Sequence, residues 1–207
     1  MTLFAFALVL GAASGYLLGG RMSCLGSVRI RWWGLIVAGL LLQLVPLPGG
    51  DGGTDLVIRT VVLSLSSVML VAFALINVRV PGMAFIMVGV FANFVVIVAN
   101  GGMPVGADAL RNSGQHAVLA QMRESEADKH HLLTDSDSLT FLSDIIAVPA
   151  PIGQAISIGD VIISLGLIWF TASSMRPGTE VRPQGTETRS AISRERETVH
   201  TDVPAAR

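Results

Sequence analysis

Charged residues are scarce in this sequence, and acidic ones are absent from its first fifty positions. Only 14% of the 207 residues are charged and the net charge is −1, whereas an ordinary soluble domain has about 25% charged residues. The lack of a basic excess excludes a typical nucleic-acid-binding protein. Because 51% of the residues are hydrophobic, a disordered chain is excluded as well. This composition is typical of a multi-span membrane protein.

The single cysteine, Cys24, excludes an internal disulfide. Catalytic motifs are missing too: the sequence has no Gly-x-Ser-x-Gly, His-Glu-x-x-His, phosphate-binding loop or dinucleotide fingerprint. His130 and His131 stand near several carboxylates, but they lack the ligand spacing of known metal sites. The sequence therefore predicts no metal and no cofactor, and it favours a non-enzymatic protein without deciding the matter.

Long apolar runs are plentiful, and five of them approach the roughly 20 residues that a spanning helix needs. They occupy residues 3–20, 32–47, 56–77, 83–100 and 156–174. No basic segment precedes the first run, so we expect it to be retained as a helix rather than cleaved as a signal peptide. The predicted fold is an all-α integral membrane bundle of about five transmembrane helices, formed by residues 1–176.

The remaining segments are predicted to form a cap and a tail. Residues 101–155 would make an external cap, with a short helix over 108–122 that Asp108 caps and an amphipathic or re-entrant segment over 139–146. Residues 177–207 are rich in Arg, Glu, Thr and Ser and lack apolar periodicity, which predicts a disordered tail.

Arginine placement predicts the orientation, because cytoplasmic loops collect Lys and Arg. The first connection contains Arg21, Arg29 and Arg31, the third contains Arg79, and Arg176 follows the fifth helix. Arg59 lies close enough to the start of the third run to snorkel outward. The second connection has Asp51 and Asp55 instead. The N-terminus and the cap should therefore lie outside, and the C-terminal tail in the cytoplasm.

Small and polar residues within the apolar runs are the candidates for specific contacts. Gly11, Gly15 and Gly19 recur every four residues, so they predict a close helix-packing face, within the bundle or between two copies. Asn93 and Asn100 share one side of the fourth helix, and an amide facing lipid would cost several kcal/mol. They are expected either to hydrogen-bond a neighbouring helix, with the serines of the third helix and Gln43 of the second as partners, or to line a polar cavity.

Two carboxylates near the predicted outer interface are open to two interpretations. Asp160 follows Ser157 by three residues, which predicts a helix capping box. Alternatively, Asp160 and Asp144 act as acid/base or ion-binding groups. Because the second and fourth connections share one side of the bundle, we expect a candidate polar cluster there, consisting of Asn93, Asn100, Lys129, His130, Asp144 and Asp160. No role is assigned to His131.

Several short motifs occur in an order that resembles a bacterial multi-span membrane family of unknown function, DUF5317. They are Gly19-Gly20-Arg21, an Arg-rich turn before a Leu-rich helix ending at Gln43, the run from Asn100 to Val105, Lys129-His130 through Asp135, Phe141 to Ile146 with its trailing prolines, and Ser157 to Asp160. The resemblance covers roughly Gly19 to Ser174. It implies a bacterial membrane protein and no established activity, and the location expected for such a chain is the inner membrane.

Three function classes remain from the sequence. The first is a non-enzymatic scaffold, sensor or accessory subunit in the lipid bilayer, with a membrane-protein partner or a second copy of itself. The second is a small carrier or channel component using an Asn-lined interior. The third is an interfacial enzyme acting on a lipid-linked substrate, with Asp144 or Asp160 as the acid/base group.

Overall fold

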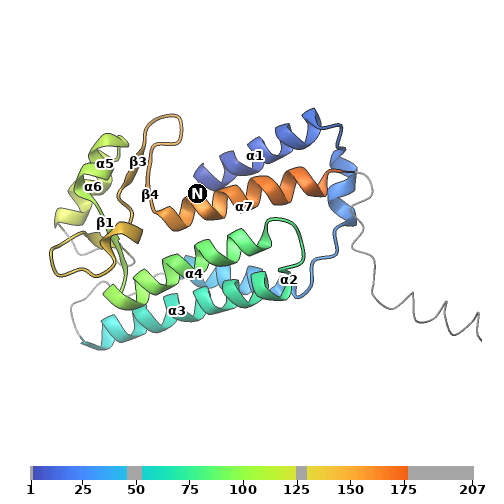
Figure 1. The fold of residues 1–207 in the computed structure, drawn as a ribbon. Coiled ribbons are helices and arrows are strands. Elements are labelled where there is room, and N and C mark those ends of the chain that lie inside the picture. Colours follow the sequence, from blue (N-terminus) through green and yellow to red (C-terminus); the bar gives the residue numbers. More distant parts are fainter. Residues whose placement is uncertain (1, 46–52, 125–129, 177–207) are drawn as a thin grey trace, which may run out of the picture.

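The computed structural model describes residues 2–45, 53–124 and 130–176, which form a helical body and a small cap (Figure 1). The five long helices are α1 (Thr2–Leu17), α2 (Trp33–Leu44), α3 (Gly53–Ile76), α4 (Met83–Asn100) and α7 (Ile158–Ser174). They coincide with the five predicted apolar runs. By length and composition α3 and α4 are long and apolar enough to cross a membrane, whereas α1, α2 and α7 are shorter apolar helices. The predicted tail, 177–207, lies outside the described residues.

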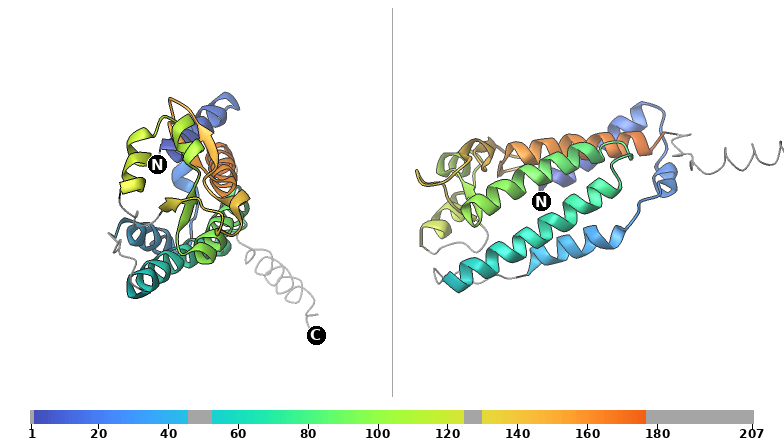
Figure 2. Two further views of the ribbon diagram at one scale, coloured as in Figure 1. Left: turned by 90° about the vertical axis from the view of Figure 1, so that its left-hand side faces the viewer. Right: turned by 60° about the horizontal axis from the view of Figure 1, so that its bottom comes forward.

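The helices form a row rather than following the order of the chain. α7 lies between α1 and α4, and α3 lies between α4 and α2 (Figures 1 and 2). α1 runs parallel to α7, since its Thr2 hydroxyl donates to Ile152 and Gln154 just before α7, and the Arg21 amide donates to the Met175 carbonyl just after it. The 3-10 helix η1 (Met22–Ser27) follows α1 at that far end.

Glycines allow α7 to approach both of its neighbours closely. A Cβ on Gly89 of α4 would lie 2.5 Å from the Gly159 carbonyl oxygen of α7. On the other side, a Cβ on Gly11 would lie 2.8 Å from Cβ of Thr171, and one on Gly15 would lie 2.7 Å from the sulfur of Met175. Close backbone contact of this kind is how helices associate where no hydrophobic drive acts between them.

Gly19 departs from the predicted packing face. α1 ends at Leu17, and Gly19 follows with a φ of +79° and nothing within 4 Å of its Cβ position. A positive φ suits glycine and ends the helix. The α1 contact face therefore contains Gly11 and Gly15, and it lies against α7 of the same chain.

The cap is not all-α, contrary to the prediction. Its strands are β1 (Met103–Val105), which pairs in parallel with β2 (His130–Leu132), and β3 (Ile146–Val148), which pairs antiparallel with β4 (Gln154–Ile156). The predicted helix over 108–122 is two helices, α5 (Ala107–Asn112) and α6 (His116–Glu124), with Gly106 instead of Asp108 at the N-cap. Gly114 separates the two helices with a φ of +83°.

The helical conformation that the spacing over 139–146 suggested is largely absent from this segment. Only one turn, η2 (Thr140–Leu142), is helical there, and β3 begins at Ile146. Leu139, Leu142 and Ile146 do recur at helical spacing, but backbone hydrogen bonds with the segment around β1 determine the conformation. The Asp144 amide donates to Pro104, and the Asp144 carbonyl accepts from Gly106, which ties this segment to β1.

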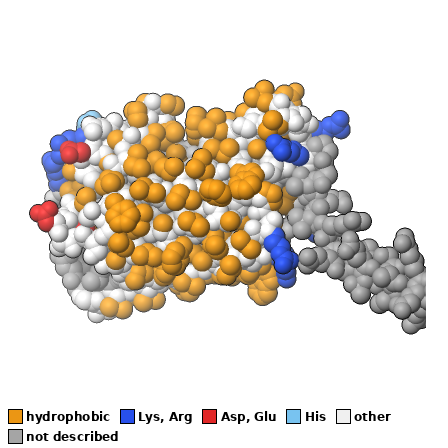
Figure 3. Space-filling model, in the orientation of Figure 1, with side chains coloured by type: hydrophobic (Ala, Val, Ile, Leu, Met, Phe, Trp, Pro, Cys, Tyr) orange, Lys and Arg blue, Asp and Glu red, His pale blue; other side chains and the backbone are white. Residues whose placement is uncertain are grey.

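Large hydrophobic side chains cover the outside of the helical body (Figure 3). Exposed members on the five helices include Val9, Leu41, Val61, Phe91 and Leu165. In the view of Figure 3 the acidic side chains lie only at the cap end, whereas basic side chains lie at both ends. This surface is the reverse of that of a soluble helical bundle, in which polar residues face outward.

Candidate functional site

The cap meets the helical body at a hydrogen-bonded group formed by Asn93, Ser157 and Asp160. The Asn93 amide nitrogen donates to Oδ1 of Asp160 at 2.9 Å, and the Ser157 hydroxyl donates to Oδ1 of Asn93 at 2.9 Å. Asn93 comes from the middle of α4, and the other two residues begin α7. Asn93 therefore does face a neighbouring helix, but its partners are on α7 and not the serines of α3.

The predicted capping box at the start of α7 is confirmed. The Asp160 amide donates to the Ser157 hydroxyl at 3.0 Å, and the Ser157 amide donates to Oδ2 of Asp160 at 3.2 Å. These two bonds satisfy backbone donors that the first turn of a helix leaves unpaired. Both oxygens of Asp160 thus accept hydrogen bonds, one from the cap of its own helix and one from α4.

Asp144 is the buried carboxylic acid of the cap. It is 8% exposed, and its Oδ1 has no hydrogen-bond partner among residues 2–45, 53–124 and 130–176. Burial, and to a lesser extent the negative charge of Asp160, raise the pKa of Asp144 to about 8. The buried hydroxyl of neighbouring Ser143 likewise lacks a partner within the described part of the chain. Asp144 is thus a carboxyl group that exchanges its proton near neutral pH.

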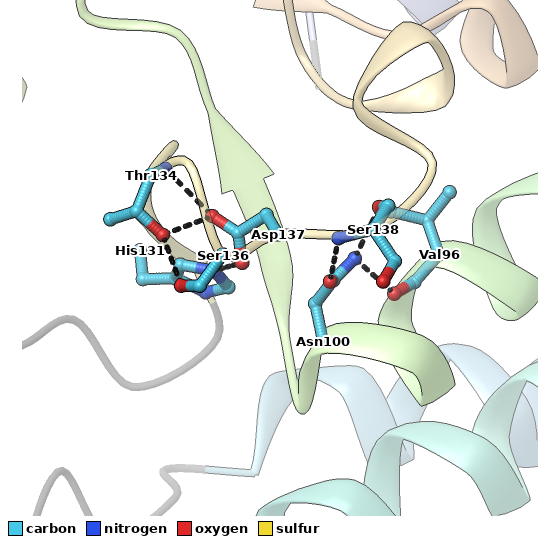
Figure 4. Close-up of polar contacts among 7 residues, drawn as sticks. All are labelled: Val96, Asn100, His131, Thr134, Ser136, Asp137 and Ser138. Atoms are coloured by element: carbon cyan, nitrogen blue, oxygen red, sulfur yellow. Dashed lines mark hydrogen bonds and ion pairs between the residues drawn. The ribbon is translucent and has the colours of Figure 1, made fainter.

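A second polar group lies at the end of α4 (Figure 4). The Ser138 amide donates to Oδ1 of Asn100 at 2.8 Å, and the Asn100 side chain donates to the carbonyls of Ser138 and Val96, both at 3.0 Å. One amide side chain therefore satisfies both backbone groups of Ser138 and a carbonyl of the last turn of its own helix. Asn100 fastens the loop of residues 133–138 to the helical body.

Asp137 organises that loop. Its Oδ1 lies 2.9 Å from Nε2 of His131, and its Oδ2 accepts from the amide and the hydroxyl of Thr134 at 2.7 and 2.9 Å (Figure 4). Burial alone would raise the pKa of Asp137, but the bonds from His131 and Thr134 outweigh it, so the pKa is lowered. Asp137 is therefore ionised at neutral pH.

A cavity of about 470 Å³ lies between this loop and the helix ends. Its lining comes from α3, the end of α4 and the loop, and consists of Thr60, Val98, Ala99, Asn100, Gly101, Ser136 and Asp137. The cavity is open to the surroundings over much of its boundary. Asn93 is not part of this lining.

The predicted cluster is thus divided into two groups. Asn93 and Asp160 bond to each other, and Asp144 interacts electrostatically with Asp160. Asn100 belongs instead to the cavity at the end of α4. Lys129 lies outside the described residues, and His130 is an exposed residue of β2.

The sequence interpretation missed several residues at these groups. His131 contacts Asp137, whereas His130 was the histidine assigned to the cluster. Adjacent residues of a strand point to opposite faces, so only one of the pair could join the loop. The spacing Thr134-x-x-Asp137 is a local turn signal that could have indicated Asp137. Nothing in the sequence indicated Thr60, which reaches the cavity from a helix far away in the chain.

The comparison with protein families decides the relationship. A model of the family of unknown function DUF5317 matches residues 27–172, more than two thirds of the chain. The chain belongs to the DUF5317 family. The match confirms the resemblance found in the sequence, and it includes Asn93, Asn100, Asp144 and Asp160, so both polar groups lie within the DUF5317 region.

The chain is similar to a curated protein of Thermotoga maritima whose printed name is "Uncharacterized protein". The two are 29% identical over 129 residues, which cover 60% of this chain and 70% of the relative. No solved structure matches. The function of a DUF5317 protein therefore has to be argued from its residues.

Proposed function

We propose that this protein crosses the bacterial inner membrane five times, with its cap outside and its C-terminus in the cytoplasm. The observation that carries the proposal is the separation of charge along the helical body. Asp and Glu of the described ranges occur only in the cap and in the first turns of α3 and α7. Five arginines occur at the other end, in the connections and after α7: Arg21, Arg29, Arg31, Arg79 and Arg176.

Helix lengths and surface chemistry support this arrangement. At 1.5 Å per residue, α3 and α4 extend about 36 and 27 Å, and α1 and α7 about 24 and 26 Å. The hydrocarbon core is about 30 Å thick and thins locally around shorter segments. α2, with 12 residues, requires its flanking residues to complete the crossing. Exposed apolar side chains between the two charged ends match such a layer.

Cysteine labelling tests this topology, and the chain supplies its own internal probe. Cys24 lies in η1, at the proposed cytoplasmic end. In spheroplasts a membrane-impermeant maleimide should leave Cys24 unlabelled until the membrane is opened. The matched variant Cys24→Ser/Asn112→Cys, with its cysteine at the exposed end of α5, should be labelled at once. Labelling of Cys24 in intact spheroplasts would refute the orientation.

For the activity we infer a non-enzymatic role, as a membrane scaffold, sensor or accessory subunit. The supporting observation is that the junction residues bond one another: both oxygens of Asp160 accept hydrogen bonds, and Asn93 bonds Asp160 and Ser157. These contacts hold the cap on the helical body. A carboxylate engaged in this way stabilises structure and is poorly placed to take a proton from a substrate.

One observation favours a second candidate, an interfacial enzyme acting on a lipid-linked substrate. Asp144 has a pKa raised to about 8 and an unpartnered Oδ1 among the described residues. A general acid or base works best when its pKa lies near the operating pH. Asp144 would be the acid/base group in this case.

One complementation experiment separates the two candidates. The variant Asp144→Asn keeps the shape of the side chain but has no acid/base group there, and it leaves the hydrogen bonds of Asp160 in place. In a strain whose own gene is deleted, a scaffold with this substitution should restore the wild-type phenotype when its level in the membrane is normal. Failure to restore it at normal protein level would reject the non-enzymatic role and favour the enzyme.

A further inference from the structure

We propose that the cavity at the end of α4 binds an organic ammonium group. The cavity has about 470 Å³ of space, enough for a small polar amine, and it lies between α3, α4 and the loop that Asp137 organises. No Lys or Arg is among its described lining residues. This inference does not depend on the orientation of the chain in a membrane.

Two sources of negative charge meet in the cavity. The first is Asp137, whose pKa is lowered, so that the carboxylate stays ionised. Its hydrogen bonds come from three donors, on His131 and Thr134, whereas a carboxylate has about four acceptor positions. Among the residues that the structure describes, one acceptor position is therefore left for a ligand N–H.

The second source is the C-terminal end of α4. Val98, Ala99 and Asn100 are its last residues, and all three line the cavity. Carbonyl groups at a helix C-terminus carry partial negative charge and attract cations. Thr60 and Ser136 are the hydroxyl-bearing residues of the lining. An ammonium group, with several N–H donors and a positive charge, is the ligand chemistry that fits this lining.

The same ammonium chemistry occurs in soluble amines and in the headgroup of phosphatidylethanolamine. Val98 and Ala99 are exposed next to the cavity, so an acyl chain would find apolar surface beside the headgroup. The lipid source rests on the proposed membrane location, whereas the soluble source does not. The two sources are therefore separated by experiment.

The experiment measures binding to the full chain purified in detergent. The probes are ethanolamine, short-chain phosphatidylethanolamine, and short-chain phosphatidylglycerol as the lipid without an ammonium group. Binding of phosphatidylethanolamine alone supports the proposal with a lipid source, and equal binding of ethanolamine supports it with a soluble source. Binding of phosphatidylglycerol as tight as that of phosphatidylethanolamine, or no binding of either ammonium probe, would overturn it.

Variants locate the binding in the cavity. Asp137→Asn should weaken binding by about tenfold or more, because a charged hydrogen-bond partner is lost. Asp135→Asn is the matched control, since it removes the same charge from the same loop but does not line the cavity. Ala99→Leu fills the cavity without touching the bonds of Asp137, and it should also abolish most binding. If Ala99→Leu binds like the wild type, the cavity is not the site.

Discussion

Asn93 and Asp160 are 67 positions apart and hydrogen-bond at 2.9 Å, joining α4 to the first turn of α7. The same carboxylate accepts from the amide of Ser157, so one side chain both caps a helix and connects it to its neighbour. Asp160 bonds both the N-cap of α7 and Asn93 of α4. Because the cap immediately precedes Ser157, these bonds connect the cap to the middle of α4. The position of the cap therefore depends on this contact.

Removal of the Asp160 carboxylate should destabilise the protein. We expect Asp160→Ala to cost about 1–3 kcal/mol, because the helix cap is lost and the Asn93 amide is left without its partner. Thermal unfolding in detergent measures the change. Asp160→Asn should lose less, since its one amide oxygen still accepts from the Ser157 amide, although the Asn93 amide loses its partner. The control is Asp108→Asn, because the side chain of Asp108 is 86% exposed. An equal loss of stability in this control would contradict a specific role for the hydrogen bonds of Asp160.

Substitution of Gly159 should separate α4 from α7. A Cβ at this position would overlap Oδ1 of Asn93 and lie 2.8 Å from the Gly89 carbonyl oxygen. Such a clash in a close-packed interface costs about 1–3 kcal/mol, so Gly159→Ala should lower the melting temperature. Gly34→Ala is the matched control, because Gly34 is in α2 with nothing within 4 Å of its Cβ position. It should leave stability unchanged or slightly raised.

Asp144 should make stability fall as pH rises. The pKa of Asp144 is raised from 3.8 to about 8 in the folded protein. Between these two values the unfolded chain is ionised whereas the folded chain retains its proton, so folding takes up a proton. Stability should therefore decrease across this window as the pH is increased, and level off above about pH 8.

Asp144→Asn should remove that pH dependence. An Asn side chain keeps the shape of the protonated carboxyl group but does not titrate. Melting temperatures should be measured for the wild type and for Asp144→Asn from about pH 5 to about pH 9, a range that includes the raised pKa of Asp144. The melting temperature of the wild type should fall relative to that of Asp144→Asn as the pH is increased. Parallel curves would show that Asp144 ionises normally in the folded protein.

Asn77 should contribute to the stability of the protein at the end of the helical body that lies opposite the cap. It is 3% exposed, accepts from the Arg31 amide at 2.8 Å and donates to the Arg31 carbonyl at 2.9 Å and to that of Phe73 at 2.9 Å. Asn77→Leu leaves these backbone groups without partners, so we expect a loss of about 2–3 kcal/mol. Thermal unfolding measures it, with Asn112→Leu at an exposed helix end as the control.

Asn77 and Asn100 make the same contact at opposite ends of the molecule. Each stands at a helix C-terminus, donates to a carbonyl four residues earlier, and pairs with both backbone groups of a distant residue, Arg31 or Ser138. The sequence showed that Asn100 had to find polar partners. It could not indicate which loop would provide them, because the partners are backbone groups, which every residue has.

The sequence by itself determined the features that depend on neighbouring residues. Apolar runs of sufficient length predicted all five helices, and Ser157 with Asp160 predicted the capping box. Gly101 ends α4 with a φ of +67° where the sequence indicated a break. Each of these signals lies within one or two turns of chain, so the local backbone energy is enough to decide the outcome.

Tertiary structure decided which distant residues meet. The polarity of the Asn93 amide predicts a partner on a neighbouring helix. Two helices flank α4, and only their order in space selects α7 over α3. In the cap, pairing with β1 converts the segment around Asp144 from the predicted helix into extended chain. The same pairing buries the Asp144 carboxyl group beside Asp160. Long-range backbone hydrogen bonds outweigh the weak helical preference of a short segment. The local sequence does not predict these bonds, because their partners lie far away in the chain.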